Sequence, residues 1–284
     1  MPLAMEGPHR GADGGADGGV ARANSAPAAQ PVPPAGLETA EEGGDERWPA
    51  RRALAEGAAA LGLPLSETQL DRFCAYAALL AAGRREFNLT ALTRPLDVAI
   101  KHFLDSLTIV PVLPPAPHRL IDVGTGAGFP GLPIKLVRPD IDVTLLEATA
   151  KKAAWLQSAV AALGLDGIAV VAARAEDVGR DPAYRGRFDV AVARALAPLP
   201  VVCELCLPFV RPGGLLVAQK TTVGVTSELP RARRALEVLG GRVREVRAVP
   251  LAQLPNRVLV IIEQERPVPD AYPRRPGIPA KRPL

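Results

Sequence analysis

Glycines at alternating positions follow a short apolar segment and could form a ligand-binding turn. Residues 119–131 read Arg-Leu-Ile-Asp-Val-Gly-Thr-Gly-Ala-Gly-Phe-Pro-Gly. Glycine adopts backbone angles that other residues resist, and it lets a ligand approach the main chain with no Cβ in the way. A strand, a glycine turn and a helix in this order predict the first βα unit of an open α/β sheet. Ligands bind such a sheet outside the carboxyl ends of its strands.

A carboxylate close before the glycines separates two kinds of ligand. Dinucleotide-binding folds place a pyrophosphate at the helix N-terminus, and Asp122 would repel it. S-adenosylmethionine carries an ammonium and a sulfonium, which a carboxylate attracts. Glu147 ends the next predicted strand, where an acid accepts hydrogen bonds from ribose hydroxyls. The pattern therefore favours S-adenosylmethionine at Gly124, Gly126 and Glu147; a tight turn with one surface acid is the structural alternative.

Alternating strand and helix signals place this turn in a larger sheet. An open, mostly parallel sheet with an antiparallel last strand is the expected α/β fold. The predicted strands are 119–123, 141–147, 168–173, 188–193 and 214–219, with a closing pair at 242–249 and 257–263. The predicted helices between them are 130–138, 149–163, 198–210 and 226–239.

Helical spacing also precedes the sheet, over 48–61, 66–82 and 96–110. Ser66 and Gln69 form a capping box for the second helix, and Gly83 is expected to end it. The tail at 272–284 holds too many prolines to form an element. Four regions follow: a disordered acidic extension, a helical region, the sheet domain and a basic tail. Their bounds are 1–46, 47–112, 113–265 and 266–284.

Composition narrows the class of protein and its partners. The net charge is +4, but residues 1–48 carry −5, so the rest of the chain is basic and suits a polyanion. Translation from a later start, such as Met5, is an alternative account of the acidic extension. Three sparse cysteines indicate a reducing compartment, and Cys203 and Cys206 fit buried packing better than a metal or redox pair. We expect a cytoplasmic monomer with no metal and no membrane segment.

Four stretches of the sequence form a recognisable set. They are Asn88-Leu-Thr-Ala with Lys101-His-Phe-Leu-Asp-Ser106, Asp122 to Gly131, Val192-Ala-Arg-Ala195, and Tyr272-Pro-Arg to Pro283-Leu284. Together they resemble the RsmG (GidB) family of bacterial 16S rRNA guanine-N7 methyltransferases, and the glycine stretch with its Phe-Pro-Gly ending is the most specific of them. The similarity covers about residues 50–284, and one departure is Thr221, where the family usually has glycine after the lysine.

The resemblance implies a class I methyltransferase fold, S-adenosylmethionine as donor, and 16S rRNA or a precursor of the small ribosomal subunit as partner. The cofactor contacts that it implies fall on Gly124, Phe129, Ala175, Glu176 and Arg194. Arg194 and Lys220 end predicted strands at the open mouth of the site, where donor and acceptor must meet, and both are candidates for positioning the substrate. The alternative is a structural ion pair for Arg194 and a surface lysine for Lys220. The basic residues expected to meet RNA are Lys101, His102, Lys220, Arg274, Arg275, Lys281 and Arg282. A packing or capping role is the alternative for His102.

The fourth strand separates possible reactions. It ends in Ala193-Arg-Ala-Leu, without the Asp/Asn-Pro-Pro-aromatic tetrad that steers amino-group methylation. Guanine N7 has an exposed lone pair and no proton, so its methylation needs positioning and no general base. The open alternatives are a 2′-O-methyltransferase using Lys220 with Lys101, a non-enzymatic assembly factor that holds the cofactor, and a nicotinamide dehydrogenase.

The C-terminal tail is expected to hold RNA and to contribute nothing to cofactor binding. The alternative is that Tyr272 and Ile278 anchor the tail to the sheet and that it serves the fold.

Overall fold

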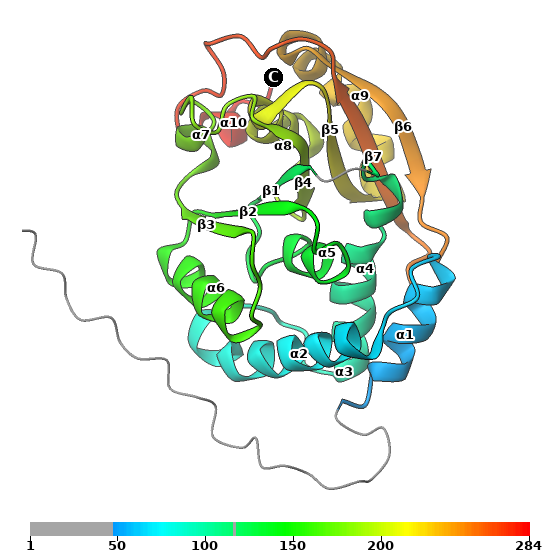
Figure 1. Cartoon of the computed structure of the whole chain (residues 1–284). Helices are drawn as coiled ribbons and strands as arrows, with labels where there is room; N and C mark the ends of the chain where they lie inside the picture. Colours follow the sequence, from blue (N-terminus) through cyan, green and yellow to red (C-terminus); the bar gives the residue numbers. More distant parts are fainter. Residues whose placement is uncertain (1–47, 116–117) are drawn as a thin grey trace, which may run out of the picture. The chain divides into compact units, whose positions relative to one another are not determined.

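The structure is a computed structural model that describes residues 48–115 and 118–284. The segment predicted to be disordered, 1–46, lies outside the described residues. So do residues 116 and 117 of the Pro-rich connection into the sheet. The described residues belong to one compact unit, in which helices cover both faces of a central sheet (Figure 1).

The central sheet has seven strands within 48–115 and 118–284, in the order β3-β2-β1-β4-β5-β7-β6. Strands β1 to β5 run parallel, and β7 is antiparallel to both of its neighbours, so the predicted antiparallel last strand is confirmed. The strand order reverses between β1 and β4, and ligands bind at such a switch point. The bounds are β1 (Arg119–Val123), β2 (Asp142–Glu147), β3 (Ile168–Ala172), β4 (Phe188–Arg194), β5 (Val210–Thr221), β6 (Gly241–Ala248) and β7 (Arg257–Gln264).

Side chains of the central strands alternate between two apolar layers, as the pleat of a strand requires. Leu120 packs into the layer that contains Leu132 of α5, whereas Ile121 packs into the layer that contains Val202 of α8. All four side chains are buried. Each large apolar side chain removed from water stabilises the fold by about 1.5–3 kcal/mol, so both layers fix the sheet on which the site is built.

The first layer is covered by the helices before the sheet and by those that follow β1 and β2. They are α1 (Arg51–Ala60), α2 (Glu67–Phe87), α3 (Pro95–Val98), the π-helical η1 (Ala99–Leu104), α4 (Asp105–Leu107), the 3₁₀ turn η2 (Val110–Val112), α5 (Gly131–Val137) and α6 (Ala150–Ala162). The second layer is covered by α7 (Ala175–Val178), α8 (Leu199–Cys206), the 3₁₀ turn η3 (Leu207–Phe209), α9 (Thr222–Leu239) and α10 (Ile278–Lys281).

The capping box at the start of α2 is confirmed, but the predicted end of this helix is wrong. Ser66 Oγ accepts from the Gln69 amide at 3.2 Å, and the Gln69 side chain accepts from the Ser66 amide at 2.9 Å. Helix α2 continues through Gly83 to Phe87. A Cβ at Gly83 would lie 2.4 Å from Nε1 of Trp155, so this glycine permits close packing against α6.

Three other boundaries differ from the predictions for local reasons. Pro208 cannot continue an α-helix, so α8 ends at Cys206 and the chain passes through η3 into β5. Thr221 caps α9 by accepting from the Gly224 amide at 3.1 Å, which starts this helix at 222. The tail forms α10 despite its prolines, because Pro279 stands in the first turn, where its missing N–H is tolerated.

Candidate active site at the glycine loop

The glycine loop lies between β1 and α5, at the switch point of the sheet. Gly124, Gly126 and Gly128 have positive φ angles of 71°, 61° and 98°. A Cβ at Gly126 would meet nothing within 4 Å, so this position faces open space. A Cβ at Gly124 would lie 2.5 Å from the side chain of Leu196, which follows β4. The loop therefore needs glycine for its conformation, and Gly126 leaves room for a ligand.

Asp122 ties the two ends of this loop together. Its Oδ2 accepts from the Thr125 hydroxyl at 2.6 Å and from the Gly131 amide at 2.7 Å. The carboxyl is fully buried, and Oδ1 has no hydrogen-bond partner among the described residues. Burial raises the pKa of Asp122 to about 7, against the lowering effect of the bonds from Thr125 and Gly131. A buried carboxyl that titrates near neutrality responds to any cation that binds close by.

Glu147 at the end of β2 holds the loop from the other side. Its Oε2 accepts from the Gly126 amide at 3.0 Å, and its Oε1 accepts from the Thr149 amide at 2.8 Å. Leu146 O accepts from the amides of Gly124 and Thr125 at 2.9 and 3.1 Å. Each carboxylate oxygen can accept a second hydrogen bond, so Glu147 retains capacity for the hydroxyls of a ribose.

Phe129 is the centre of an aromatic stack beneath the mouth of the site. Its ring stacks on His102 at a centroid distance of 4.5 Å and on Tyr76 at 5.4 Å. The guanidinium carbon of Arg194 lies 4.8 Å from the centroid of the same ring. The Tyr76 hydroxyl donates to Ala127 O at 2.5 Å, which joins the stack to the glycine loop. The ring of Phe129 is buried by these contacts and supports the loop, and its expected contact with the cofactor stays a prediction.

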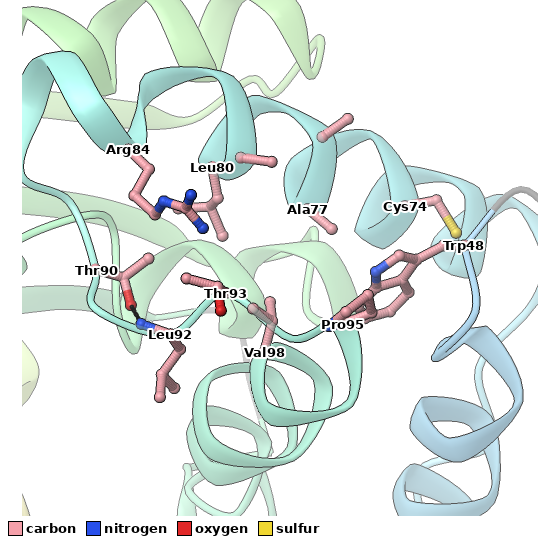
Figure 2. Close-up of a pocket in the computed structure, with 12 residues that line it drawn as sticks. Trp48, Cys74, Ala77, Leu80, Arg84, Thr90, Leu92, Thr93, Pro95 and Val98 are labelled. Carbon is pink, nitrogen blue, oxygen red and sulfur yellow. Dashed lines mark hydrogen bonds between the residues drawn. The ribbon is translucent and has the colours of Figure 1, made fainter.

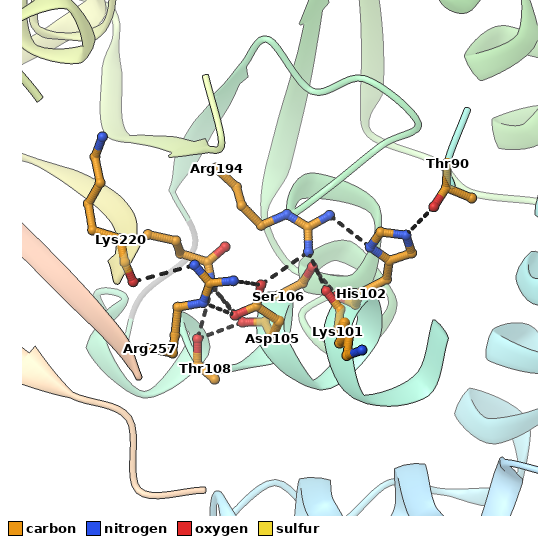
Figure 3. Close-up of polar contacts among 10 residues, drawn as sticks. Thr90, Lys101, His102, Asp105, Ser106, Thr108, Arg194, Lys220 and Arg257 are labelled. Carbon is orange, nitrogen blue, oxygen red and sulfur yellow. Dashed lines mark hydrogen bonds and ion pairs between the residues drawn. The ribbon is translucent and has the colours of Figure 1, made fainter. Parts of the chain in front are cut away.

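Arg194 ends β4 and lies in a polar network with residues from four other elements, η1, α4, β5 and β7 (Figure 3). Its Nη1 donates to Lys101 O at 3.0 Å and lies 3.3 Å from Asp105 Oδ2. Arg257 of β7 reaches the same carboxylate, with Nε 2.7 Å from Oδ1 and Nη2 2.9 Å from Oδ2. Gln219 of β5 donates to Asp105 O at 2.6 Å. The network fixes the Arg194 guanidinium at the carboxyl end of β4.

Burial and charge act against each other in this network. Asp105 is fully buried, and burial raises its pKa although Arg257 and Arg194 lower it. Burial also lowers the pKa of Arg194, against the effect of Asp105. Two guanidinium groups on one carboxylate leave the group of three with a single net positive charge.

His102 is held as a neutral imidazole. Burial, together with the nearby charge of Arg194, lowers its pKa to about 4. Arg194 Nη2 lies 3.3 Å from His102 Nδ1, and an arginine can only donate, so Nδ1 is the acceptor. The proton therefore sits on Nε2, which donates to Thr90 Oγ1 at 2.6 Å. The prediction of His102 as an RNA contact remains untested, and the structure places the ring in the stack on Phe129.

The two lysines expected at the mouth lie in different surroundings. Lys101 has a half-exposed side chain whose ammonium lies 2.8 Å from Asp97 Oδ1. Lys220 is mostly buried, and its ammonium donates to Ala197 O at 2.6 Å and to Glu228 Oε2 at 2.7 Å. Glu228 also accepts from the Leu199 amide at 2.6 Å. Lys220 therefore ties the loop after β4 to α9 and shows an ion pair in place of an open phosphate site.

Two residues expected to contact the cofactor, Ala175 and Glu176, lie in α7, next to the tail. Ala175 begins α7, and the next residue, Glu176, has a buried side chain whose Oε1 accepts from the Gly277 amide at 2.9 Å. Arg274 lies 2.5 Å from Glu204 Oε2 of α8. The remaining tail cations, Arg275, Lys281 and Arg282, are exposed. The structure therefore brings Glu176 against the tail and removes Arg274 from the set of open cations.

Sequence reasoning missed Asp105, Arg257, Gln219 and Tyr76. Asp105 lies in the quoted stretch Lys101 to Ser106, three residues after His102 and on the same side of a helix. A charged residue on an apolar helix face was the one available signal, because a carboxylate is rarely fully buried without a partner. Arg257 and Gln219 gave no comparable signal. Within the described residues, no group of three His, Cys, Asp or Glu could hold a metal ion.

A separate apolar cavity of about 180 Å³ lies between α2 and the segment that leads into α3 (Figure 2). Trp48, Leu80, Arg84 and Pro95 line it, and Thr90 lies at its wall. Thr90 also accepts from His102, whose ring stacks on Phe129, so this side chain links the cavity to the aromatic stack. No helix of residues 48–115 and 118–284 is both long and apolar enough to cross a membrane.

The strand order, the glycine loop after β1 and the acid that ends β2 define a class I S-adenosylmethionine-dependent methyltransferase. The family model GidB, described as rRNA small subunit methyltransferase G, matches residues 69–256. The chain belongs to this family of rRNA methyltransferases.

Curated relatives match over nearly their whole length. The chain is 42% identical over 236 residues to ribosomal RNA small subunit methyltransferase G of Acetivibrio thermocellus, covering 82% of this chain and 96% of the relative. It is 46% identical to the protein of that name from Deinococcus deserti, covering 83% and 96%. The corresponding protein of Moorella thermoacetica is 47% identical, covering 82% and 98%. A solved methyltransferase from Aquifex aeolicus aligns with a TM-score of 0.46 and 19% identity, covering 59% and 93%.

Proposed function

We propose that this chain transfers the methyl group of S-adenosylmethionine to N7 of a guanine in 16S rRNA. Membership of the rRNA small subunit methyltransferase G family is the observation that carries the proposal. The division of the chain at residues 47, 113 and 266, action as a monomer and a cytoplasmic location remain predictions.

The residues of the loop fit the cofactor. S-adenosylmethionine supplies an electrophilic methyl group on a positively charged sulfur. Gly126 faces open space, Glu147 has lone pairs left for ribose hydroxyls, and Asp122 has an unpaired carboxyl oxygen behind the loop. We assign the cofactor to Gly124, Gly126 and Glu147, with Ala175 and Glu176 at its adenine end.

Arg194 is our candidate for positioning the guanine. A guanidinium has five N–H donors, and the described contacts use Nη1 twice and Nη2 once. Two donors remain for the substrate. Guanine presents O6 next to N7, and arginine is its commonest specific partner. A hydrogen bond from Arg194 to O6 would orient the ring and leave the N7 lone pair free.

Among the described residues around Arg194, the lack of an available base supports N7 as the acceptor atom. Both ring nitrogens of His102 are engaged, and Asp105 is paired with Arg257 and Arg194. A 2′-hydroxyl acceptor would require a group that removes its proton. Lys220 and Lys101, the lysines considered for this role, are paired with Glu228 and Asp97. These contacts disfavour the 2′-O-methyltransferase.

The exposed cations are the proposed contacts to RNA. Arg275, Lys281 and Arg282 of the tail are exposed, and Lys101 is half-exposed near Arg194. Cations of this kind bind phosphates and release counterions, so their contribution weakens as salt is raised. The ion pairs of Lys220 with Glu228 and of Arg274 with Glu204 favour structural roles for these two residues.

Nucleoside analysis of methylated RNA tests the proposal. Small ribosomal subunits and naked 16S rRNA are incubated with the protein and labelled S-adenosylmethionine, then digested and analysed by mass spectrometry. We expect 7-methylguanosine from the wild type and at least a hundredfold lower kcat/KM from Arg194→Gln. Arg187→Gln, which removes an exposed arginine that bonds only Pro182 O among the described residues, is the control. A 2′-O-methylated nucleoside, or cofactor binding without transfer, would contradict the proposal.

A further inference from the structure

The C-terminal tail is fastened to the part of the molecule that follows β3. Arg185 donates to the carbonyls of Val268 and Tyr272 at 2.7 and 2.8 Å. Arg180 donates to the carbonyls of Ala271 and Pro273 at 3.2 and 2.8 Å. These backbone carbonyls lie in a segment that is irregular up to α10. Two arginine side chains from the segment between α7 and β4 thus satisfy carbonyl groups that a neighbouring strand would otherwise bond.

Arg274 is the strongest single anchor of the tail. Its backbone amide and Nε donate to Glu204 Oε1 at 2.9 and 2.8 Å, and Nη2 lies 2.5 Å from Oε2. The Glu204 side chain is 1% exposed, so this carboxylate needs its cation. An arginine that is paired twice with a buried acid is a fixed part of the structure.

Beyond this anchor, the tail reaches a residue of the cofactor site. The Gly277 amide donates to Glu176 Oε1 at 2.9 Å, and no other hydrogen bond to the Glu176 carboxylate from a described residue is seen. Gly277 has a φ of +81°, a conformation that aims this amide and that residues other than glycine resist. Because Glu176 is buried and held by the tail, its position depends on a segment 101 residues further along the chain.

We propose that the C-terminal tail is a wall of the cofactor site: anchored through Arg274 on Glu204, it holds Glu176 in place through the Gly277 amide and so sets the affinity for S-adenosylmethionine. This inference rests on the proposed function, which places Glu176 at the adenine end. It differs from the expectation that the tail serves RNA alone. Arg274 and Gly277 are therefore positioning residues for the cofactor, while the exposed cations of the tail remain open to RNA.

Calorimetry with S-adenosylmethionine, in the absence of RNA, tests this role. The double variant Glu204→Gln/Arg274→Gln removes the anchor without leaving a buried charge. Its Kd should rise at least tenfold, about 1.4 kcal/mol, and its KM for the cofactor should rise in proportion while kcat at saturation changes less than twofold. Arg274→Lys, which restores a cation, should recover part of the affinity. Removal of residues 272–284 should weaken binding at least as much.

The control is Glu245→Gln/Arg247→Gln, which breaks an exposed ion pair on the edge strand β6 and should leave Kd unchanged. Far-UV circular dichroism establishes that each variant is folded. A folded anchor variant or truncated protein with Kd within twofold of the wild type would overturn the inference. A wild type that binds no S-adenosylmethionine would instead refute the proposed function.

Hydrogen exchange on the unmodified protein gives a test that does not depend on any variant. Saturating S-adenosylmethionine should slow exchange in peptides that contain Gly277, because cofactor and tail stabilise the same carboxylate. Exchange that is slowed at the glycine loop and unchanged in the tail would also overturn the inference.

Discussion

Binding of S-adenosylmethionine should release a proton from Asp122. The free protein holds this carboxyl buried, with a pKa of about 7, so roughly half of the molecules carry the proton at pH 7. The cofactor brings an ammonium and a sulfonium to the glycine loop. An opposite charge nearby lowers a carboxyl pKa by about 1–3 units, which ionises Asp122 in the complex. For a shift of two to three units, about half a proton should therefore leave at pH 7, and about 0.8–0.9 of a proton at pH 6.

The same shift predicts how affinity depends on pH. Below pH 7 the cofactor must displace a proton, so Kd should rise up to about tenfold, or about 1.4 kcal/mol, for each unit that the pH falls. This rise ends once pH drops below the pKa of Asp122 in the complex. Above pH 8 the carboxylate is already ionised, and affinity should no longer change through this group.

Calorimetry in two buffers of different ionisation heat measures the released proton directly. Asp122→Asn is the matched variant, because its amide oxygen can still accept from Thr125 and Gly131. It should bind without proton release and with affinity that is flat across pH 6–8. S-adenosylhomocysteine, which lacks the sulfonium charge, should release less of the proton from the wild type. The reasoning is refuted if the wild type shows no buffer-dependent heat at pH 6.5.

Three further outcomes follow from the site. Gly126→Val should abolish cofactor binding with little loss of fold, since its side chain would enter open space at a φ of +61°; near-normal binding heat from a folded variant would contradict this. Asp105→Asn should lower the free energy of unfolding by about 3–5 kcal/mol, because Arg194 and Arg257 lose their buried counter-charge. Urea titration measures this change, and a decrease below about 1 kcal/mol would be inconsistent with the network. His102 has a pKa of about 4 in the folded state and about 6.5 in the unfolded state, so its contribution to stability is complete above pH 6.5. As pH falls from 6.5 towards 4, the free energy of unfolding should drop by about 2–3 kcal/mol through this group. Ring resonances that titrate near pH 6.5 in the folded protein would disprove this.

The fold was predictable because its signals are local. The buried strands β1, β2 and β4 are short, mostly apolar runs, and the capping box at Ser66 involves residues three apart. Gly83 shows where local reasoning ends. Its sequence context suits a helix end, but the residue that determines its role is Trp155, which packs on it from α6. A glycine at a close helix contact and a glycine at a helix end have the same local pattern.

The site was predictable where a single motif carries it. The glycine loop, Glu147 and Arg194 all stand next to predicted strand ends, so the rule for parallel sheets placed them together. Asp105 and Arg257 are 152 positions apart, and only the pairing of β7 with β5 brings them into contact. The sequence predicts Lys220 and Arg274 as RNA contacts, because sequence alone does not show that Glu228 and Glu204 face them.

The charges around Arg194 suit a reaction whose product base is a cation. Methylation at N7 places a positive charge on the purine and moves no proton to the protein, so an uncompensated cation beside N7 would oppose the reaction. Asp105, which lies 3.3 Å from Arg194, offsets one of the two positive charges of Arg194 and Arg257, and burial together with Arg194 keeps His102 neutral. Below about pH 4 His102 would be protonated. It would then add a further positive charge beside Arg194 and could no longer accept a hydrogen bond from Arg194. Neutral His102 therefore serves the chemistry twice, by holding the arginine in place and by adding no charge of its own.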